Sequence, residues 1–261
     1  MTTLIINADD FGYNEGRTRA ILECFEKRLI SNTTLMVNMP FADEAVELAR
    51  RAGVVNHVGL HLNLTEGRPL TDNIRKNPLF CDADGFFNAN FHRSLKKRVL
   101  LSMVEQLGVA EEIDAQLRRY CSFGLTQLHL DSHHHSHTDF SVFRILAPLA
   151  AQYGFRTMRL SANLRPGGLG LMKGVYKTLF NAKLRKRFGS VDSFGQISEA
   201  DALWSSVSGR SLELMVHPLH CQDGTGDDSD TRGEYETRVD DIRAFLSAHN
   251  GDFRLVSYGE L

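Results

Sequence analysis

The chain of 261 residues lacks the segments by which secreted and membrane-spanning proteins are recognised. No charged leader with an apolar run and a cleavage site opens it, because Met1 leads almost directly into TLIINADD. The sequence also contains no run of about eighteen apolar residues, the length that a membrane-spanning helix needs. We therefore expect a cytoplasmic protein without a membrane partner.

Cysteine is scarce and widely spaced. The four cysteines include no C-x-x-C pair and stand at Cys24, Cys81, Cys121 and Cys221. This spacing argues against a zinc ribbon, which needs closely spaced pairs of ligands. Isolated cysteines favour reduced thiols over a disulfide framework, in keeping with a cytoplasmic location.

An excess of charge of one sign is also missing. The 30 lysines and arginines nearly balance the 32 aspartates and glutamates, which leaves a formal net charge of −2. Such a chain exerts no long-range attraction on nucleic acid or anionic membranes, so neither partner is expected. The first apolar run is not followed by G-x-G-x-x-G, and no G-x-x-x-x-G-K-[ST] occurs. Nucleotide binding therefore loses its main support.

What the sequence does contain is a regular alternation of short apolar runs and segments with helical spacing. Strand-like runs cover residues 3–9, 33–38, 56–64, 125–131 and 155–161, with further candidates at 190–194, 212–218 and 253–257. This alternation predicts βαβ units around a parallel sheet. Seven or eight strands over this length favour an α/β fold whose mostly parallel strands form a closed or nearly closed (β/α) barrel. We expect one domain over residues 1–261.

Two segments, residues 65–108 and 162–190, interrupt the alternation. Both are too long for ordinary loops, so we expect insertions that cover a site. The second segment is rich in basic residues, namely Lys173, Lys177, Lys183, Arg185, Lys186 and Arg187. A solvated helix face is the favoured interpretation of these basic residues, and contact with a polar substrate is the alternative.

Titratable side chains gather where the expected strands end. Asp9 and Asp10 close the first strand, His61 the third, Arg159 the fifth, and His217 ends a later one. In a parallel barrel the chemistry sits at the C-terminal ends of the strands. We therefore expect these side chains to converge on one rim.

The stretch LHLDSHHHSH closes the fourth strand and holds five of the eleven histidines. It is internal and interrupted, which excludes an expression tag. If the strand persisted, alternation would place His129, Asp131, His133, His135 and His137 on one side. A catalytic metal site takes only about three protein ligands. We expect His133 as a ligand, with His135 as the alternative, and Asp131 as a hydrogen-bond partner that orients a ligand.

Paired carboxylates beside histidines indicate metal-assisted hydrolysis. Two adjacent carboxylates repel unless a cation neutralises one of them, so one would bind an ion while the other stays free as a base. One aspartate with two histidines suits Zn²⁺, Co²⁺, Ni²⁺, Mn²⁺ or Mg²⁺. The absence of a thiolate ligand and of a redox motif favours hydrolysis. Asp9 is placed to deprotonate a water molecule, and His217 to protonate a departing amine.

The motifs NADDFG, GLHLNLTEG, HLDSHHHSH and VHP together resemble the YdjC-like carbohydrate deacetylase family, which includes chitooligosaccharide deacetylases. The resemblance spans nearly the whole chain in order and spacing, and SNTTLMVNMPFADEA adds to it. It implies a distorted (β/α) barrel, a homodimer and removal of acetyl groups from N-acetylated sugars. It further implies one divalent metal ion, Mg²⁺ or Zn²⁺, held by Asp10, His61 and His133.

A looser similarity to polysaccharide deacetylases implies roles for the remaining rim residues. Asp9 matches their catalytic base, His217 their catalytic acid, and Arg159 the arginine that orients the base. The metal-binding histidines implied here are distributed differently from the H-x-x-x-H motif of that broader group. The resemblance therefore leaves open which histidine of residues 133–137 binds the ion.

Two other functions compete with carbohydrate N-deacetylation. A metal-dependent hydrolase could act on another bond, such as a phosphodiester or a different amide, although phosphoester sites commonly use two metals and more carboxylates. A non-catalytic protein could bind metal or sugar in the same pocket, but it would need neither Asp9 as base nor His217 as acid. Release of acetate from N-acetylated chitooligosaccharides distinguishes the three.

Overall fold

In the computed structural model, the chain folds around one curled sheet, described over residues 1–165, 167, 170–219 and 237–261. The strands follow the order β5-β4-β3-β2-β1-β7-β6, and β10 pairs with the start of β1. All pairings between these strands are parallel. The strands are β1 Thr2–Phe11, β2 Asn32–Leu35, β3 Val58–Leu62, β4 His129–Ser132, β5 Thr157–Met158, β6 Ser193–Gln196, β7 Ser211–Val216 and β10 Phe253–Leu255, with a separate small pair of β8 Pro218–Leu219 and β9 Thr237–Arg238.

The two ends of the strand order approach each other without forming a regular ladder. A single bridge joins Thr157 of β5 to Gly189. Beyond β5, the backbone N–H groups of Asn163 and Leu164 donate to the carbonyl of Phe194 in β6 at 3.2 and 3.1 Å. The sheet therefore curls into a half-barrel, which confirms the expected distorted barrel of mostly parallel strands. The distortion has a local cause, since β5 is only two residues long.

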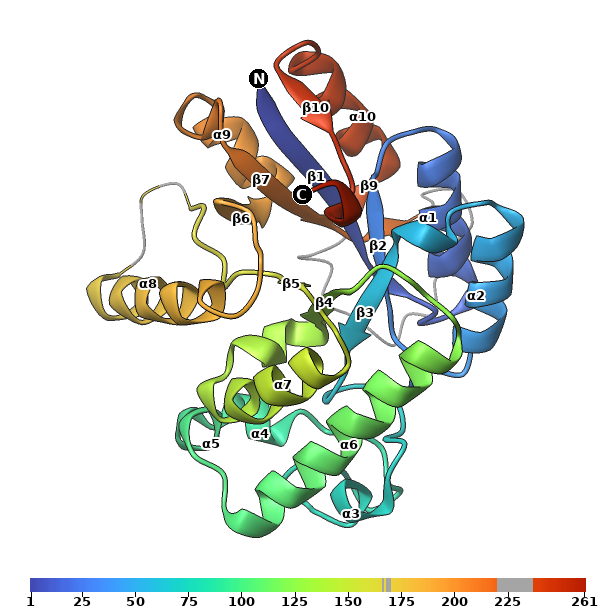
Figure 1. Ribbon diagram of the computed structural model, residues 1–261, viewed down its shortest axis with the longest axis vertical. Coiled ribbons are helices and arrows are strands. Elements are labelled where there is room, and N and C mark those ends of the chain that lie inside the picture. Colours follow the sequence, from blue (N-terminus) through green and yellow to red (C-terminus); the bar gives the residue numbers. More distant parts are fainter. Residues whose placement is uncertain (166, 168–169, 220–236) are drawn as a thin grey trace.

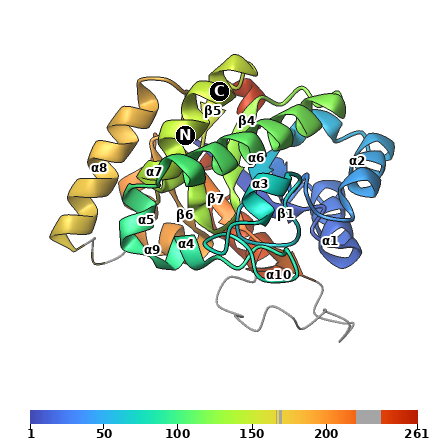
Figure 2. The ribbon, with the colours of Figure 1, turned by 90° about the horizontal axis from the view of Figure 1, so that it is seen from below.

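Helices surround the sheet (Figure 1), with α1 and α2 on one side, α6 and α7 on another, and α8 and α9 on a third. Figure 2 shows α8 at the edge of the molecule opposite α1 and α2. The helices are α1 Glu15–Glu26, α2 Ala42–Arg51, α3 Asp72–Arg75, α4 Asn90–Arg93, α5 Leu95–Val99, α6 Met103–Ser122, α7 Phe140–Gln152, α8 Leu171–Arg185, α9 Ile197–Val207 and α10 Val239–Ala248, with short 3₁₀ turns at Val55–His57, His133–Thr138 and Tyr258–Glu260.

Strand β1 lies at the centre of the sheet and positions the polar rim. Its apolar run is almost continuous because both of its faces are buried, as in other parallel sheets; Leu4, Ile5 and Ile6 are fully buried. The turn after β1 leads into α1, where the side chain of Asn14 accepts a hydrogen bond from the backbone of Arg17 at 2.9 Å. This cap fixes the path of the chain immediately beyond the rim.

The two long segments fold in different ways. Residues 65–108 contain three short helices and run into α6, which holds the segment through buried side chains. Glu112 accepts from the backbone N–H groups of Leu70 and Thr71, and Gln116 bonds both backbone groups of Asn63. The second segment contains α8, whose basic side chains are exposed or half-buried. The segment after β3 is therefore anchored beside the rim.

The described helices include none that is long and apolar enough to cross a membrane. Cys24, Cys81 and Cys121 are free thiols, and Cys221 lies outside the described residues. Helix α9 was not anticipated from the sequence. It begins directly after β6, with a capping box between Gln196 and Glu199.

Candidate functional site

The rim at the C-terminal ends of the strands brings the candidate residues together. His133, just past β4, places Nδ1 2.9 Å from Oδ1 of Asp10 at the end of β1. His61 in β3 places Nε2 3.2 Å from the same oxygen. Beyond β7, Nε2 of His217 lies 3.9 Å from Oδ2 of Asp10. Residues separated by up to about two hundred positions thus meet around one carboxylate.

Asp9 and Asp10 point in different directions because β1 is irregular at its end. The register between β1 and β2 shifts between Ala8 and Phe11. Asp10 has a φ of 66°, in the left-handed region that aspartate tolerates better than most residues. The side chain of Asp10 consequently faces the histidines, while Asp9 faces Arg159.

Asp10, His61 and His133 form a buried group that could hold a metal ion. One ligand atom from each of the three lies within 4.8 Å of the others. Nε2 of His133 is buried and has no hydrogen-bond partner among the described residues, and Nε2 of His61 is buried with Oδ1 of Asp10 at 3.2 Å. Buried polar atoms rarely lack a partner other than a neighbouring carboxylate, so we expect these two nitrogens to bind a ligand. Oδ2 of Asp10 is held by Nη1 of Arg17 at 2.5 Å.

Asp131 orients His61 within this group. Its Oδ1 lies 2.7 Å from Nδ1 of His61, and its Oδ2 accepts from the hydroxyl of Thr34 at 3.1 Å. Since a carboxylate only accepts hydrogen bonds, Nδ1 of His61 carries the proton and Nε2 faces Asp10. Burial alone would lower the pKa of His61, but Asp131, Asp10 and Asp9 raise it to about 10. A cation at this position would therefore meet a strongly negative field.

Asp9 is engaged by a guanidinium rather than by histidines. Nη1 of Arg159 donates to Oδ2 of Asp9 at 2.6 Å, and Nη2 donates to Oδ1 at 2.7 Å. Oδ1 also accepts from Nδ2 of Asn7 at 2.8 Å. Burial alone would raise the pKa of Asp9, but the paired Arg159 lowers it below its ordinary value. Asp9 is therefore ionised and rigidly held.

Arg159 is itself fully buried and is held by two further acids. Its Nη2 lies 2.7 Å from Oδ2 of Asp131, and its Nε donates to Oε1 of Glu213 at 2.7 Å. The hydroxyl of Tyr258 donates to the other oxygen of Glu213. Burial raises the pKa of Glu213 to about 7, against the opposing charge of Arg159.

Sequence reasoning missed Glu213 and Tyr258. The signal in the sequence was weak but present, because a glutamate interrupts the apolar run SLELMV at an even spacing from His217. Alternation therefore places Glu213 and His217 on the same side of the strand. Tyr258 carries no comparable signal, since an aromatic residue near a strand end is most often part of a core.

The histidine-rich stretch divides into residues with different surroundings. Strand β4 ends at Ser132, and positive φ values of 50° and 54° at His134 and His135 break the alternation that would have aligned five side chains. His137 bonds Ser132 through Nδ1 and the carbonyl of Arg159 through Nε2. It therefore supports the fold of the rim. The ring of His135 packs against that of Phe194, with 5.8 Å between the centroids.

His217 lies at the margin of the cluster. Its side chain is 15% exposed, and its backbone bonds Thr237 in both directions, at 3.0 and 3.3 Å. Burial lowers the pKa of His217 below its ordinary value, while the nearby carboxylates of Asp10 and Asp9 act in the opposite direction. The imidazole is thus beside the cluster and within reach of solvent.

Comparisons with known proteins agree with this geometry. The family model described as YdjC-like protein matches residues 3–253. The chain is 34% identical over 218 residues to a carbohydrate deacetylase of Geobacillus stearothermophilus, covering 83% of this chain and 79% of the relative. It is 32% identical over 216 residues to a chitooligosaccharide deacetylase of Yersinia pestis (strain Pestoides F), covering 82% and 81%.

A solved structure shares the fold. The crystal structure of an Enterococcus faecalis V583 protein, named as a candidate for cellobiose-phosphate cleavage, aligns with a TM-score of 0.70. The alignment covers 99% of this chain and 98% of that protein at 22% sequence identity. At this identity the likeness concerns the fold alone.

Proposed function

The chain belongs to the YdjC-like family, and from that premise we propose that it is a metal-dependent hydrolase that removes acetyl groups from N-acetylated sugars or oligosaccharides. The observation that carries the proposal is the buried group of Asp10, His61 and His133 beside the Asp9–Arg159 pair. The first part supplies ligands for an ion, and the second supplies a fixed base.

The charges around the rim fit one divalent cation. The carboxylates of Asp9, Asp10 and Asp131 outnumber the guanidiniums of Arg17 and Arg159 by one negative charge, and Glu213, whose pKa is about 7, adds a second when it is ionised. We propose that Asp10, His61 and His133 hold one ion. One carboxylate and two imidazoles suit Zn²⁺, and Mg²⁺ is the alternative. Such an ion polarises a carbonyl and makes a water molecule more acidic.

Asp9 would accept the proton of the attacking water at a definite atom. Oδ1 already accepts from Arg159 and Asn7, whereas Oδ2 accepts only from Arg159 among the described residues. A carboxylate oxygen has about two acceptor positions, so Oδ2 keeps one for water. Arg159 holds this oxygen in place and keeps Asp9 ionised.

His217 would complete the reaction as the acid. The water oxygen attacks the acetyl carbonyl carbon, the bond from carbon to nitrogen breaks, and the departing amine takes a proton from His217. The products are acetate and the free amine. The lowered pKa of His217 makes its imidazolium a readier proton donor. Its exposed edge lets it face a substrate bound above the rim.

Hydrolysis of a phosphodiester with two metal ions fits the site less well. The two other groups of candidate ligands in the described chain are Asp9, His61 and Asp131, and His129, Asp131 and Glu213. The fully buried guanidinium of Arg159 is paired with every carboxylate in both groups. A fixed cation in that position repels a second metal ion. Arg17, by contrast, binds Asp10 through Oδ2 and leaves Oδ1 to the histidines. One ion with a neighbouring acid and base favours hydrolysis of an amide.

Acetate release from N-acetylated chitooligosaccharides tests the proposal. We expect acetate with the wild-type protein, loss of release after chelation, and recovery on adding back Zn²⁺ or Mg²⁺, whichever is the native ion. Ser247→Arg, an exposed change on α10 away from the rim, is a matched control that should retain release. Failure to release acetate with any added divalent ion would contradict the proposal.

The same proposal includes a homodimer, as the family resemblance implies, and no nucleic-acid partner, as the balanced charge implies. It also includes a cytoplasmic location, which the scattered cysteines favour. Light scattering on the purified protein measures the assembly directly. A mass equal to a single chain would remove the homodimer from the proposal and leave the catalytic part intact.

A further inference from the structure

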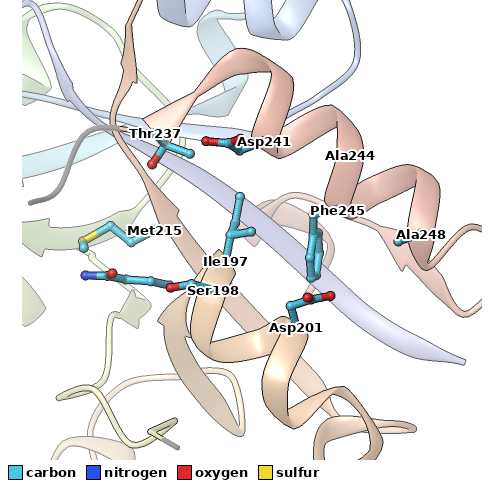
Figure 3. A pocket seen from close by; sticks show the side chains of 10 residues that line it. Ile197, Ser198, Asp201, Met215, Thr237, Asp241, Ala244, Phe245 and Ala248 are labelled. Atoms are coloured by element: carbon cyan, nitrogen blue, oxygen red, sulfur yellow. The ribbon is translucent and has the colours of Figure 1, made fainter.

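A groove opens between α9 and α10, next to the rim but outside the catalytic cluster. Its volume is about 440 Å³, within the range of small-molecule sites. Figure 3 shows Met215 and Thr237 at one end and Ala248 at the other, with Ile197 and Phe245 projecting between the two helices. Asp241 and Ala248 lie about two turns apart on α10, roughly 10 Å along its axis. The groove is therefore elongated.

One end of the groove is joined to the proposed acid. Thr237 lines the groove and makes two hydrogen bonds with His217. Its backbone N–H donates to the carbonyl of His217 at 3.0 Å, and its hydroxyl accepts from the backbone N–H of His217 at 3.3 Å. Met215, also in the lining, pairs in register with Asn7 of β1. Asn7 in turn donates to Asp9. One end of the groove therefore lies near His217 and near Asn7, the residue that donates to Asp9. The groove extends away from both.

The lining suits a sugar. Ile197, Met215 and Phe245 offer apolar surface for the C–H face of a ring. Polar groups that can bond ring hydroxyls surround this surface, namely Gln196, Ser198, Asp201, Thr237 and Asp241. Carboxylates only accept hydrogen bonds, so Asp241 suits donors such as hydroxyl or ammonium groups, while Asp201 already pairs with His249 at 3.0 Å through one of its two oxygens. Anionic groups would be repelled.

We propose that this groove is a subsite for the sugar units that neighbour the unit being deacetylated, and that it takes neutral or amine-bearing units. The inference rests on the proposed function, because it assumes that the rim removes acetyl groups from a sugar chain. It adds where the remainder of the chain lies and which charge that remainder carries. In this proposal, residues of α9 and α10 determine the preference for substrate length and charge. The reacting groups lie at the ends of β1, β3, β4 and β7.

Blocking the groove tests the proposal. Ala244 is exposed and lines the groove, so Ala244→Arg adds a long side chain there at little cost in helix propensity. The control Ser247→Arg places the same side chain on α10 at an exposed position that does not line the groove. Acetate release is measured on N-acetylated chitooligosaccharides of increasing length with all three proteins.

We expect kcat/KM of the wild type and of Ser247→Arg to rise with chain length. In Ala244→Arg the rise should disappear, with a loss of at least about tenfold on the longest substrate and little change on the shortest. An unchanged length preference in Ala244→Arg overturns the groove as a subsite. If the wild type releases no acetate from any of them, the proposed function fails, and calorimetric binding of the longest oligosaccharide then decides the groove. Equal affinities of the wild type and Ala244→Arg overturn it in that case as well.

The charge of the occupant is tested separately with Asp241→Asn. The variant should lose affinity for fully deacetylated chitooligosaccharides, whose units carry ammonium groups, and the loss should shrink as salt is added. Affinity for the fully acetylated chain should change less. Asp240→Asn, one position earlier and outside the lining, is the matched control. Equal behaviour of the two variants contradicts a role of Asp241 in recognising the sugar.

Discussion

Asp9 and Asp10 are neighbours in the sequence and both are almost completely buried, and each is bound by an arginine, but the rest of their surroundings differ. Asp9 receives three hydrogen bonds from Arg159 and Asn7. Asp10 faces Nε2 of His61 and Nδ1 of His133, and Nε2 of His133 is buried without a hydrogen-bond partner in the part of the chain that the structure describes. Both oxygens of Asp9 are thus held by Arg159, whereas Asp10 gives Oδ2 to Arg17 and presents Oδ1 to the two histidines.

This difference separates two tasks that require different environments. A carboxylate whose two oxygens are both held by one guanidinium, as in Asp9, stays ionised and fixed, and it can accept a proton at its remaining lone pair. A carboxylate that faces imidazole nitrogens forms a ligand set for a divalent ion. The backbone makes the separation possible, because the φ of 66° at Asp10 turns the two side chains apart.

The largest effect is expected from removing a proposed metal ligand. Asp10→Ala, His61→Ala and His133→Ala should each lose stoichiometric metal and, with it, all measurable acetate release, because each deletes one of about three protein ligands. Metal content after purification is the measurement. His135→Ala is the matched control and should keep its metal. If His135→Ala loses the ion and His133→Ala keeps it, the histidines have been assigned in the wrong order.

Removing the base should give a smaller effect. Asp9→Asn is expected to retain metal and to lose deacetylation by at least about a hundredfold, mostly in kcat, because general-base assistance contributes on the order of 10² to 10⁴ in rate. Asp10→Asn should instead lose metal first. Metal content and acetate release are measured on both variants in parallel. The opposite pattern would exchange the two roles, and a fully active Asp9→Asn would exclude Asp9 as the base.

A smaller loss of activity is expected from Glu213, which holds Arg159 from the side away from Asp9. Glu213→Gln keeps the shape of the side chain but removes the charge that holds Nε of Arg159. We expect metal content and KM to stay unchanged and kcat to fall about tenfold, which corresponds to roughly 1.4 kcal/mol of transition-state stabilisation. Steady-state kinetics with a thermal melt separates this outcome from general destabilisation. A kcat equal to that of the wild type would show that Arg159 is positioned without Glu213.

The smallest effect is expected from Tyr258→Phe. The variant loses the hydroxyl that donates to Glu213 but keeps the ring, which stacks on His129 with 3.4 Å between the centroids. One lost hydrogen bond should lower the free energy of unfolding by about 0.5–1.5 kcal/mol. Denaturant unfolding measures this, and kcat should stay within a few-fold of the wild type. A larger fall in kcat than in Glu213→Gln would mean that Tyr258 contacts the reacting groups directly.

The sequence predicted the fold and the rim better than the interior. Strand ends could be located from apolar runs, so the placement of Asp10, His61 and His217 at one rim followed from the parallel barrel alone. The link between Arg159 and Asp9 was implied by the similarity to polysaccharide deacetylases. The two residues lie at the ends of β5 and β1, which are not neighbouring strands, and they meet across the curled sheet. Glu213 could not be assigned a partner in advance, since which buried groups meet inside a barrel depends on strand register across distant segments.

Local backbone geometry accounts for the remaining differences. Alternation along the histidine stretch failed beyond Ser132, because a turn with left-handed residues replaces the strand there. Helix α9 was not predicted, because its sequence, ISEADALWSSV, has few strong helix signals apart from its capping box. The groove that it forms with α10 depends on how the two helices pack, which no local pattern encodes.

The central position of β1 has a consequence for folding. Thr3 pairs with Ser211 and Thr2 with Phe253, so the strand that carries both carboxylates gains these partners only from segments more than two hundred residues away. Contacts at such separation form late and slow the search for the native state. Until then, Asp9 and Asp10 belong to an incompletely paired strand and cannot present an organised ligand set. Capture of the metal ion should therefore be one of the last events in folding, and its rate would report when β7 has joined β1.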